Sequence, residues 1–335
     1  MWTLKNRTPY AAERSWIRDK HGVHHWVVAV KATFAFSDTG ALTLADEQLP
    51  VVVAPEWFGD PASTSLKYDT DTGPPKPSTD VIVIGSAYAP KGKVATSVPV
   101  RLRFGAVDKS LIVFGDRVYE TGPVGVVLSS PARFAKKAIR YEEAWGGADL
   151  THPDASKHAR DPRNPVGRGF SVHASLHRKT AHSVEYPQGF ASKSGPAGFC
   201  AIDRPWQPRI AHAGTYDGAW VKHKKPLLPD DYDPRFELCA PPDQRQKEYV
   251  YGGELVELTN MIPAGVLRLT LPKIYLTFST KIRGGVEQHR ARLASVILEP
   301  DDQRVALVWQ SSLQVAARQV EHLDVTTISE KPYAT

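Results

Sequence analysis

The stretch HHWVVAVKATFAF, residues 24–36, is the clearest secondary-structure signal in this chain. Its large apolar side chains recur at every second position. One face of the expected strand carries Trp26, Val28, Val30, Phe34 and Phe36. The opposite face carries Val27, Lys31 and Thr33. A period of two residues is typical of a half-buried β-strand, so this stretch predicts a long strand and no helix.

The same alternation recurs further along the chain. Residues 97–104, SVPVRLRF, place apolar side chains on one face and arginines on the other, and Pro99 indicates an edge position or a bulge. Residues 109–120 are the expected hairpin partner of this strand. Near the C-terminal end, residues 294–300 and 304–310 predict a second hairpin, because the short DDQ segment joins them.

Helical signals are weak, and the best of them covers residues 130–147. The sequence therefore predicts a mainly β fold with two packed antiparallel sheets, sandwich-like, a layer of long ordered loops and few short helices. We expect one unit over residues 1–335. Within it, residues 1–130 and 250–335 would form an interleaved β body, and residues 131–249 a loop-rich recognition layer.

The middle of the chain is crowded with Pro, Gly, Asp and His, which favour turns and extended backbone. It also carries aromatic side chains at regular intervals, among them Phe170, Trp206, Trp220 and Phe236. Disordered segments are poor in aromatic residues. We therefore expect ordered, irregular backbone that these rings fix onto the β body.

Composition narrows the class of protein. The 335 residues are 41% hydrophobic and 23% charged, which is ordinary for a folded chain. The net charge of +6 comes from Lys and Arg spread along the sequence, so nucleic acid is not an expected partner. No apolar run approaches the roughly 18 residues of a membrane helix, and residues 1–16 contain no apolar core of signal-peptide length. We expect a cytoplasmic protein without a membrane partner, and Cys200 and Cys239 as buried thiols.

No motif for catalysis emerges. The chain has no G-x-S-x-G elbow, no phosphate loop and no zinc-protease motif. Asp217, Asp231 and Asp233 lie close together in the sequence, and such carboxylates can act as acid and base or hold a metal. In Pro-rich loops they more often cap backbone N–H groups or pair with an arginine such as Arg235. We expect no catalytic residues, no metal and no cofactor.

A series of longer motifs points to a family. In chain order they are WVVAVKATFAF, KPSTDVIVIGSAYAP, EEAWGG, NPVGRGF, AGTYDGAW, KPLLPDDYDPRF, APPDQR, GGELVELTNMIPAGVLRLTLP and VILEPDDQRVALVW. With these motifs the sequence resembles the domain-of-unknown-function 2169 (DUF2169) family, which is associated with type VI secretion systems. The resemblance covers nearly the whole chain.

The resemblance implies an adaptor or chaperone that holds a toxic effector protein and helps load it onto the valine-glycine-repeat spike or its tip protein. Some relatives carry an added pentapeptide-repeat tail, and we expect this chain to be the domain alone. Trp, Tyr and Arg most often anchor protein interfaces. The candidate partner-binding residues are Trp145, Gly146, Gly147, Asn164, Gly167, Arg168, Asp217, Trp220, Asp231, Asp233, Arg235 and Phe236.

Two other classes remain open. A carboxylate-dependent hydrolase would need the aspartates of residues 217–233 to converge in one pocket. A structural component of the secretion apparatus would assemble into rings or fibres. The rings and glycines of the candidate site can equally be part of the core, and Arg168 is the expected discriminator, because arginine is seldom fully buried without a partner.

Overall fold

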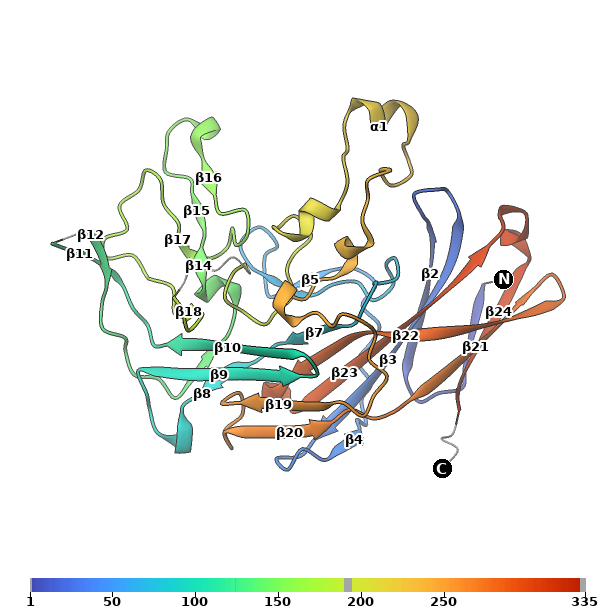
Figure 1. Cartoon of the computed structure of the whole chain (residues 1–335), viewed down its shortest axis with the longest axis horizontal. Coiled ribbons are helices and arrows are strands. Elements are labelled where there is room, and N and C mark those ends of the chain that lie inside the picture. The colour runs from blue at the N-terminus through green and yellow to red at the C-terminus, as the bar shows by residue number, and fades with distance from the viewer. Residues whose placement is uncertain (1, 124, 190–194, 332–335) are drawn as a thin grey trace.

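The computed structural model describes residues 2–123, 125–189 and 195–331 (Figure 1). Strand residues clearly outnumber helical residues in this part of the chain, so the mainly β prediction is confirmed. Its single α-helix, α1, is short, and the other helical segments described are 3₁₀ turns. Among the described residues, no helix has both the length and the apolar character needed to cross a membrane.

The largest element is a nine-stranded sheet with the path β1-β24-β21-β22-β23-β3-β2, to which β4 and β7 are added at the side. Its strands are β1 (Thr3–Asn6), β2 (Ala11–Arg18), β3 (His24–Phe36), β4 (Leu42–Leu44), β7 (Asp80–Val83), β21 (Tyr275–Ile282), β22 (Gly285–Glu299), β23 (Arg304–Val315) and β24 (Leu323–Lys331).

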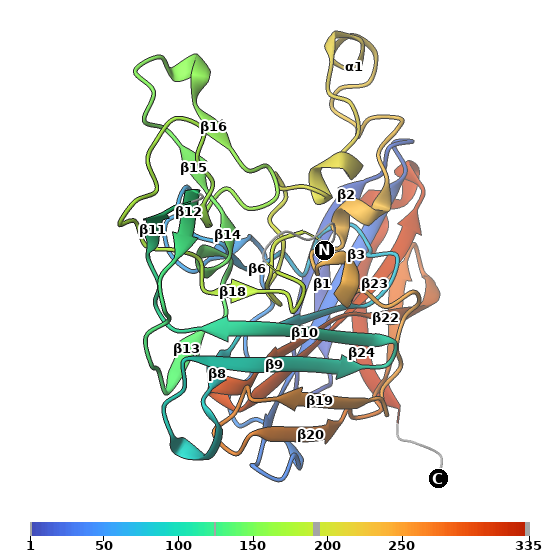
Figure 2. The same ribbon diagram turned by 60° about the vertical axis from the view of Figure 1, so that its left-hand side comes forward.

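This sheet curves into a nearly closed barrel. Its path begins with β1 and ends with β2, and these two strands follow each other directly in the chain (Figures 1 and 2). The rings of Trp2 and Trp16 stack across the junction with centroids 5.4 Å apart, and Trp26 packs against both. No ladder in the described chain pairs β1 with β2, so these rings cover a junction between two sheet edges.

The second large element is a five-stranded sheet in the order β18 (Val184–Glu185), β10 (Val107–Phe114), β9 (Ser97–Phe104), β19 (Leu255–Thr259) and β20 (Val266–Thr270). One hydrophobic core contains residues of both sheets. The predicted antiparallel sandwich is not confirmed, because the larger sheet curves into a nearly closed barrel and because β1–β24 and β7–β22 are parallel pairs. Long-range pairing of the first and last strands produces this closure.

Within the ranges described, five smaller strand pairs lie outside the two large sheets, and two of them fall within the loop-rich residues 131–249. They are β5 (Glu56–Trp57) with β6 (Leu66–Tyr68), β8 (Ser86–Tyr88) with β13 (Lys136–Ala138), β11 (Tyr119–Gly122) with β12 (Gly125–Leu128), β14 (Trp145–Gly146) with β17 (Arg168–Gly169), and β15 (Ala148–Asp149) with β16 (Ala159–Arg160).

Strand β3 has the predicted bounds, and both predicted hairpins, β9–β10 and β22–β23, are present. The prediction of half-burial is wrong for β3, because Lys31 and Thr33 on its second face are also buried. The chain after β4 covers that face. Gln48 hydrogen-bonds the backbone of Thr33, and the ammonium group of Lys31 lies 3.2 Å from the Asp71 carboxylate.

The helix predicted over residues 130–147 does not form. Residues 136–138 pair with β8 instead, and Tyr141–Glu143 make a single 3₁₀ turn. The Tyr141 ring is fully buried and its hydroxyl donates to the Cys200 carbonyl at 2.7 Å. Tertiary contacts therefore override a weak local preference.

A chain of hydrogen bonds crosses the barrel. The Trp26 indole donates to Thr326, whose hydroxyl lies 2.7 Å from that of Thr280. Thr280 contacts Nε2 of His289, and Nδ1 of His289 contacts Ser311, which donates to a backbone carbonyl of β22. Each group donates to the next only when His289 is neutral. Burial accordingly lowers the pKa of His289 to about 4.

Candidate functional site

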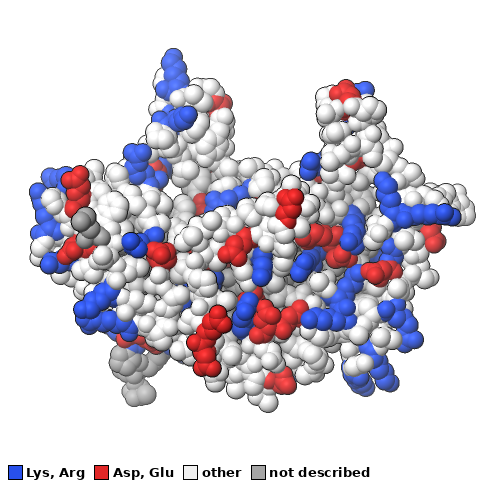
Figure 3. All heavy atoms as spheres, turned by 180° about the vertical axis from the view of Figure 1, so that it is seen from behind, with Lys and Arg blue, Asp and Glu red and all other residues white. Residues whose placement is uncertain are grey.

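The loop-rich segment forms two separate projections on one side of the β body (Figures 1 and 2). The first projection, residues 148–160, carries β15, β16 and the 3₁₀ turn Ala155–Lys157. The second projection, residues 214–231, carries α1 (Gly218–His223). Figure 3 shows them from behind as two knobs with a hollow between them. The predicted recognition layer therefore forms two separate projections instead of one continuous surface.

Closely packed backbone segments support the first projection. Gly146 and Gly147 have φ of 147° and 117°, in the region that favours glycine. A Cβ on Gly147 would lie 2.6 Å from the Gly167 carbonyl oxygen, and one on Gly146 would collide with the Asn164 backbone. The fully buried Asn164 side chain donates to the Trp145 carbonyl at 3.0 Å. These predicted site residues form the frame of the projection.

The side chains of Arg168 and Trp145 lie at the base of this frame and are half-buried. Both terminal nitrogens of Arg168 lie 2.9 Å from the Glu143 carboxylate oxygens, and Glu143 also accepts from Ser183 at 2.8 Å. The Trp145 ring meets Phe170 edge-on, with centroids 6.4 Å apart. Glu143 was not among the predicted site residues. Its position two residues before Trp145 could have indicated it.

Local hydrogen bonds hold the second projection rigid. Asp217 caps α1 by accepting from the Trp220 N–H at 2.9 Å. The Trp220 indole then donates to the Leu227 carbonyl, at 2.9 Å, across the projection. At its base, Asp231 accepts from both the N–H and the hydroxyl of Thr215. Asp217, Trp220 and Asp231 therefore fix the shape of this projection.

The remaining predicted residues lie where the second projection joins the β body. Asp233 accepts from the Arg235 backbone and side chain at 2.8 Å, and this hydrogen bonding lowers the pKa of Asp233 to about 2. Phe236 is half-buried, and its carbonyl accepts from Arg209 at 2.7 Å. Arg209 is fully buried and also donates to the Asp69 carboxylate.

Asp69 links this junction to the β body. Burial opposes its ionisation, but the positive charges of Arg209, Arg204 and Lys76 hold the pKa of the Asp69 carboxyl below its ordinary value. A buried ion pair that loses one partner leaves an uncompensated charge. The pair thus anchors the second projection. No spacing in the sequence distinguishes Arg209 from the other arginines, so it could not be predicted.

The three candidate aspartates do not form a shared site. Asp217 caps α1, Asp231 binds Thr215, and Asp233 pairs with Arg235. Across the described ranges, no group of three or more His, Cys, Asp or Glu side chains is placed to hold a metal ion. Cys200 and Cys239 are buried free thiols, as expected, and burial raises the pKa of each to about 12.

Both projections present apolar side chains to solvent. Tyr216 and Val221 on the second projection are 53% and 57% exposed. Leu150 is exposed on the first, and Val172 is exposed beside it on a loop whose N–H groups bind Asp149. Sequence reasoning missed Leu150, Val172 and Val221, because isolated aliphatic residues in a loop carry no pattern.

A family model described as an uncharacterized protein conserved in bacteria (DUF2169) matches residues 21–310. The chain belongs to the DUF2169 family. The match runs from the turn before β3 to the middle of β23 and includes both projections. No curated protein and no solved structure matched the chain. The DUF2169 match confirms the predicted family and, by its description, assigns no activity.

Proposed function

We propose that this DUF2169 protein is a cytoplasmic adaptor that binds a type VI secretion effector and helps to load it onto the spike complex. The observation that carries the proposal is the pair of projections, each held by local contacts, with exposed apolar side chains. Contiguous exposed apolar patches mark protein interaction sites. On the second projection Tyr216 and Val221, both exposed, lie within one short loop and helix. The link to type VI secretion rests on the family resemblance.

The local hydrogen bonds of the second projection favour a role in partner binding. Asp217, Trp220 and Asp231 already hold the loop in one shape, so binding needs little further ordering of the backbone. Tyr216 lies against Trp220 with ring centroids 4.8 Å apart, which leaves its outer face and Val221 available to a partner. Aromatic side chains of this kind often supply most of the binding energy.

The predicted site residues take two roles in this proposal. Gly146, Gly147, Gly167 and Asn164 fix the first projection from within. The contact surface of the proposed site has two parts. Trp145 and Arg168 lie at the base of the first projection, and Tyr216, Trp220, Val221, Arg235 and Phe236 lie on the second projection or at its junction with the β body. The effector and the spike or its tip protein are the proposed partners, and no cofactor takes part.

The two alternatives require different geometry or behaviour. A carboxylate-dependent hydrolase needs convergent acids, whereas Asp217, Asp231 and Asp233 each serve a local cap or pair. A structural component of the apparatus would assemble with itself into rings or fibres, whereas an adaptor forms small complexes.

Co-purification tests the proposal. The tagged full-length protein is expressed together with the products of its neighbouring genes and analysed by size-exclusion chromatography with light scattering. We expect a small complex of defined mass with one secreted protein. High-order assembly of the isolated chain would support the structural alternative and contradict the adaptor proposal.

A further inference from the structure

We propose that a cleft between β21 and β22, remote in sequence from both projections, binds a short segment of a partner protein that carries large apolar side chains followed by carboxylates. This site is additional to the projections. The peptide test below does not depend on the identity of the effector.

The cleft arises because two paired strands separate. β21 and β22 pair from Ile282↔Gly285 to Thr277↔Arg290. β22 then continues and takes β7 as its new neighbour only from Ser295. In the described part of the chain, no strand pairs with residues 291–294 on the side away from β23. A β-bulge between Leu293 and Ser295 bends β22 at this point.

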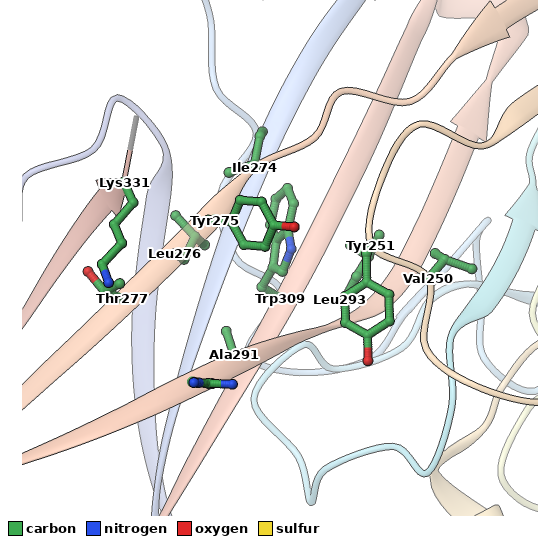
Figure 4. A pocket seen from close by; sticks show the side chains of 11 residues that line it. Val250, Tyr251, Ile274, Tyr275, Leu276, Thr277, Ala291, Leu293, Trp309 and Lys331 are labelled. Atoms are coloured by element: carbon green, nitrogen blue, oxygen red, sulfur yellow. The ribbon is translucent and has the colours of Figure 1, made fainter. Parts of the chain in front are cut away.

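The opening between the strands is a pocket of about 520 Å³, within the range of about 300–1,000 Å³ that is typical of ligand pockets. Trp309 and Leu293 lie in its buried wall. Tyr251 and Tyr275 line its mouth and are 68% and 48% exposed. Figure 4 shows Tyr275 and Trp309 in the wedge between the strands, with Tyr251 and Leu293 beside them. The lining suits large apolar side chains.

Positive charge borders one side of the pocket. Arg290 lines it and also lines a neighbouring hollow of about 370 Å³, which Arg292 shares. Both arginines are exposed, and neither forms an ion pair with an acidic side chain of the described residues. Lys331 adds a third cation to the pocket wall. Arg292 lies over the Tyr249 ring, 4.8 Å from its centroid, and this contact does not neutralise its charge. Arginines without a carboxylate partner beside an apolar pocket favour an anionic group next to an apolar one.

An extended protein segment that enters the pocket fits these features better than a flat partner surface does. Tyr, Trp and Arg are the side chains most enriched at the centres of protein interfaces. The pocket lies where β22 lacks a neighbour for four residues, which at about 3.3 Å per residue suits an extended segment of similar length. The Leu293 carbonyl already accepts from Thr79, so side chains rather than added sheet pairing would dominate recognition.

Two matched peptides test the proposal. Acetyl-Gly-Phe-Leu-Asp-Glu-Gly-amide and its neutral counterpart acetyl-Gly-Phe-Leu-Asn-Gln-Gly-amide are titrated by calorimetry into the full-length protein. We expect the acidic peptide to bind about tenfold more tightly, because two arginines contact its carboxylates. The double variant Arg290→Gln/Arg292→Gln should remove this preference and leave neutral-peptide binding unchanged. Tyr251→Ala should weaken both peptides.

Arg318→Gln is the control, because Arg318 is exposed in the 3₁₀ segment Ala317–His322, which meets the Ile282 end of β21 rather than the Tyr275 end. This variant should bind both peptides as the wild type does. Equal affinity for the two peptides, an undiminished preference in the double arginine variant, or no saturable binding of the acidic peptide would overturn the proposal. None of these outcomes bears on the projections, so the adaptor proposal is tested separately.

Discussion

The guanidinium group of Arg168 contacts the carboxylate of Glu143 at two points, Nη1–Oε2 and Nη2–Oε1, both 2.9 Å. The Arg168 side chain is 34% exposed. Removal of Arg168 would leave a half-buried carboxylate with its Lys137 and Ser183 contacts alone. Arg168 therefore contributes to the stability of the fold.

We expect Arg168→Ala to lower the free energy of unfolding by about 1–2 kcal/mol, because a charge-assisted hydrogen-bonded pair is lost from a partly exposed site. Urea denaturation measures this change. Arg160→Ala, at an exposed position of β16, should change stability by less than about 0.5 kcal/mol. Equal stability of the two variants would refute a structural role for the Arg168–Glu143 pair.

Sequence periodicity was sufficient to predict β3, the β9–β10 hairpin and the β22–β23 hairpin, because burial imposes alternation within each strand. It could not predict the barrel. Closure depends on Thr3 pairing with Val325, and no local pattern encodes a partner more than three hundred residues away. The candidate site was predicted as one layer, but β14, which contains Trp145 and lies below the first projection, is separated from α1, which contains Trp220 and belongs to the second projection (Figure 1).

Gly146→Ala should destabilise the closely packed backbone below the first projection. The residue has a φ of 147°, and an added Cβ would collide with the Asn164 backbone. We expect a loss of at least about 2 kcal/mol of unfolding free energy. Gly218→Ala is the matched control, because a Cβ there meets open space at the start of α1. The control should be neutral or slightly stabilising, and a stable Gly146→Ala protein would contradict the described backbone.

The neutral state of His289 predicts a dependence of stability on pH. Its pKa falls from an ordinary value near 6.5 in the unfolded chain to about 4 in the fold. Between these values only the unfolded chain binds the proton, so stability is full above about pH 6.5 and decreases as pH falls toward 4. The loss reaches up to about 3 kcal/mol. Melting temperatures of the wild type and His289→Gln should show a weaker slope in the variant across this window, whereas His223→Gln, an exposed position, should retain the wild-type slope.

Cys200 and Cys239 provide a test of global packing. Both thiols are buried, and the pKa of each is raised to about 12, so almost no thiolate forms at pH 8. We expect the folded protein to show no fast reaction with a thiol-specific disulfide reagent and to react at two sites after addition of denaturant. Rapid labelling of the folded protein at either cysteine would contradict the burial described for that residue.

Affinity for the co-purified effector, measured together with melting temperature for Val221→Ser, tests the adaptor account most directly. Val221 is 57% exposed on the second projection, and Val286→Ser is the control at a 59% exposed position on the β21–β22 hairpin. The adaptor proposal predicts that Val221→Ser weakens effector binding about thirtyfold, equivalent to about 2 kcal/mol. It also predicts that Val221→Ser leaves the melting temperature unchanged and that Val286→Ser alters neither quantity. Wild-type affinity in the folded Val221→Ser protein would contradict the account.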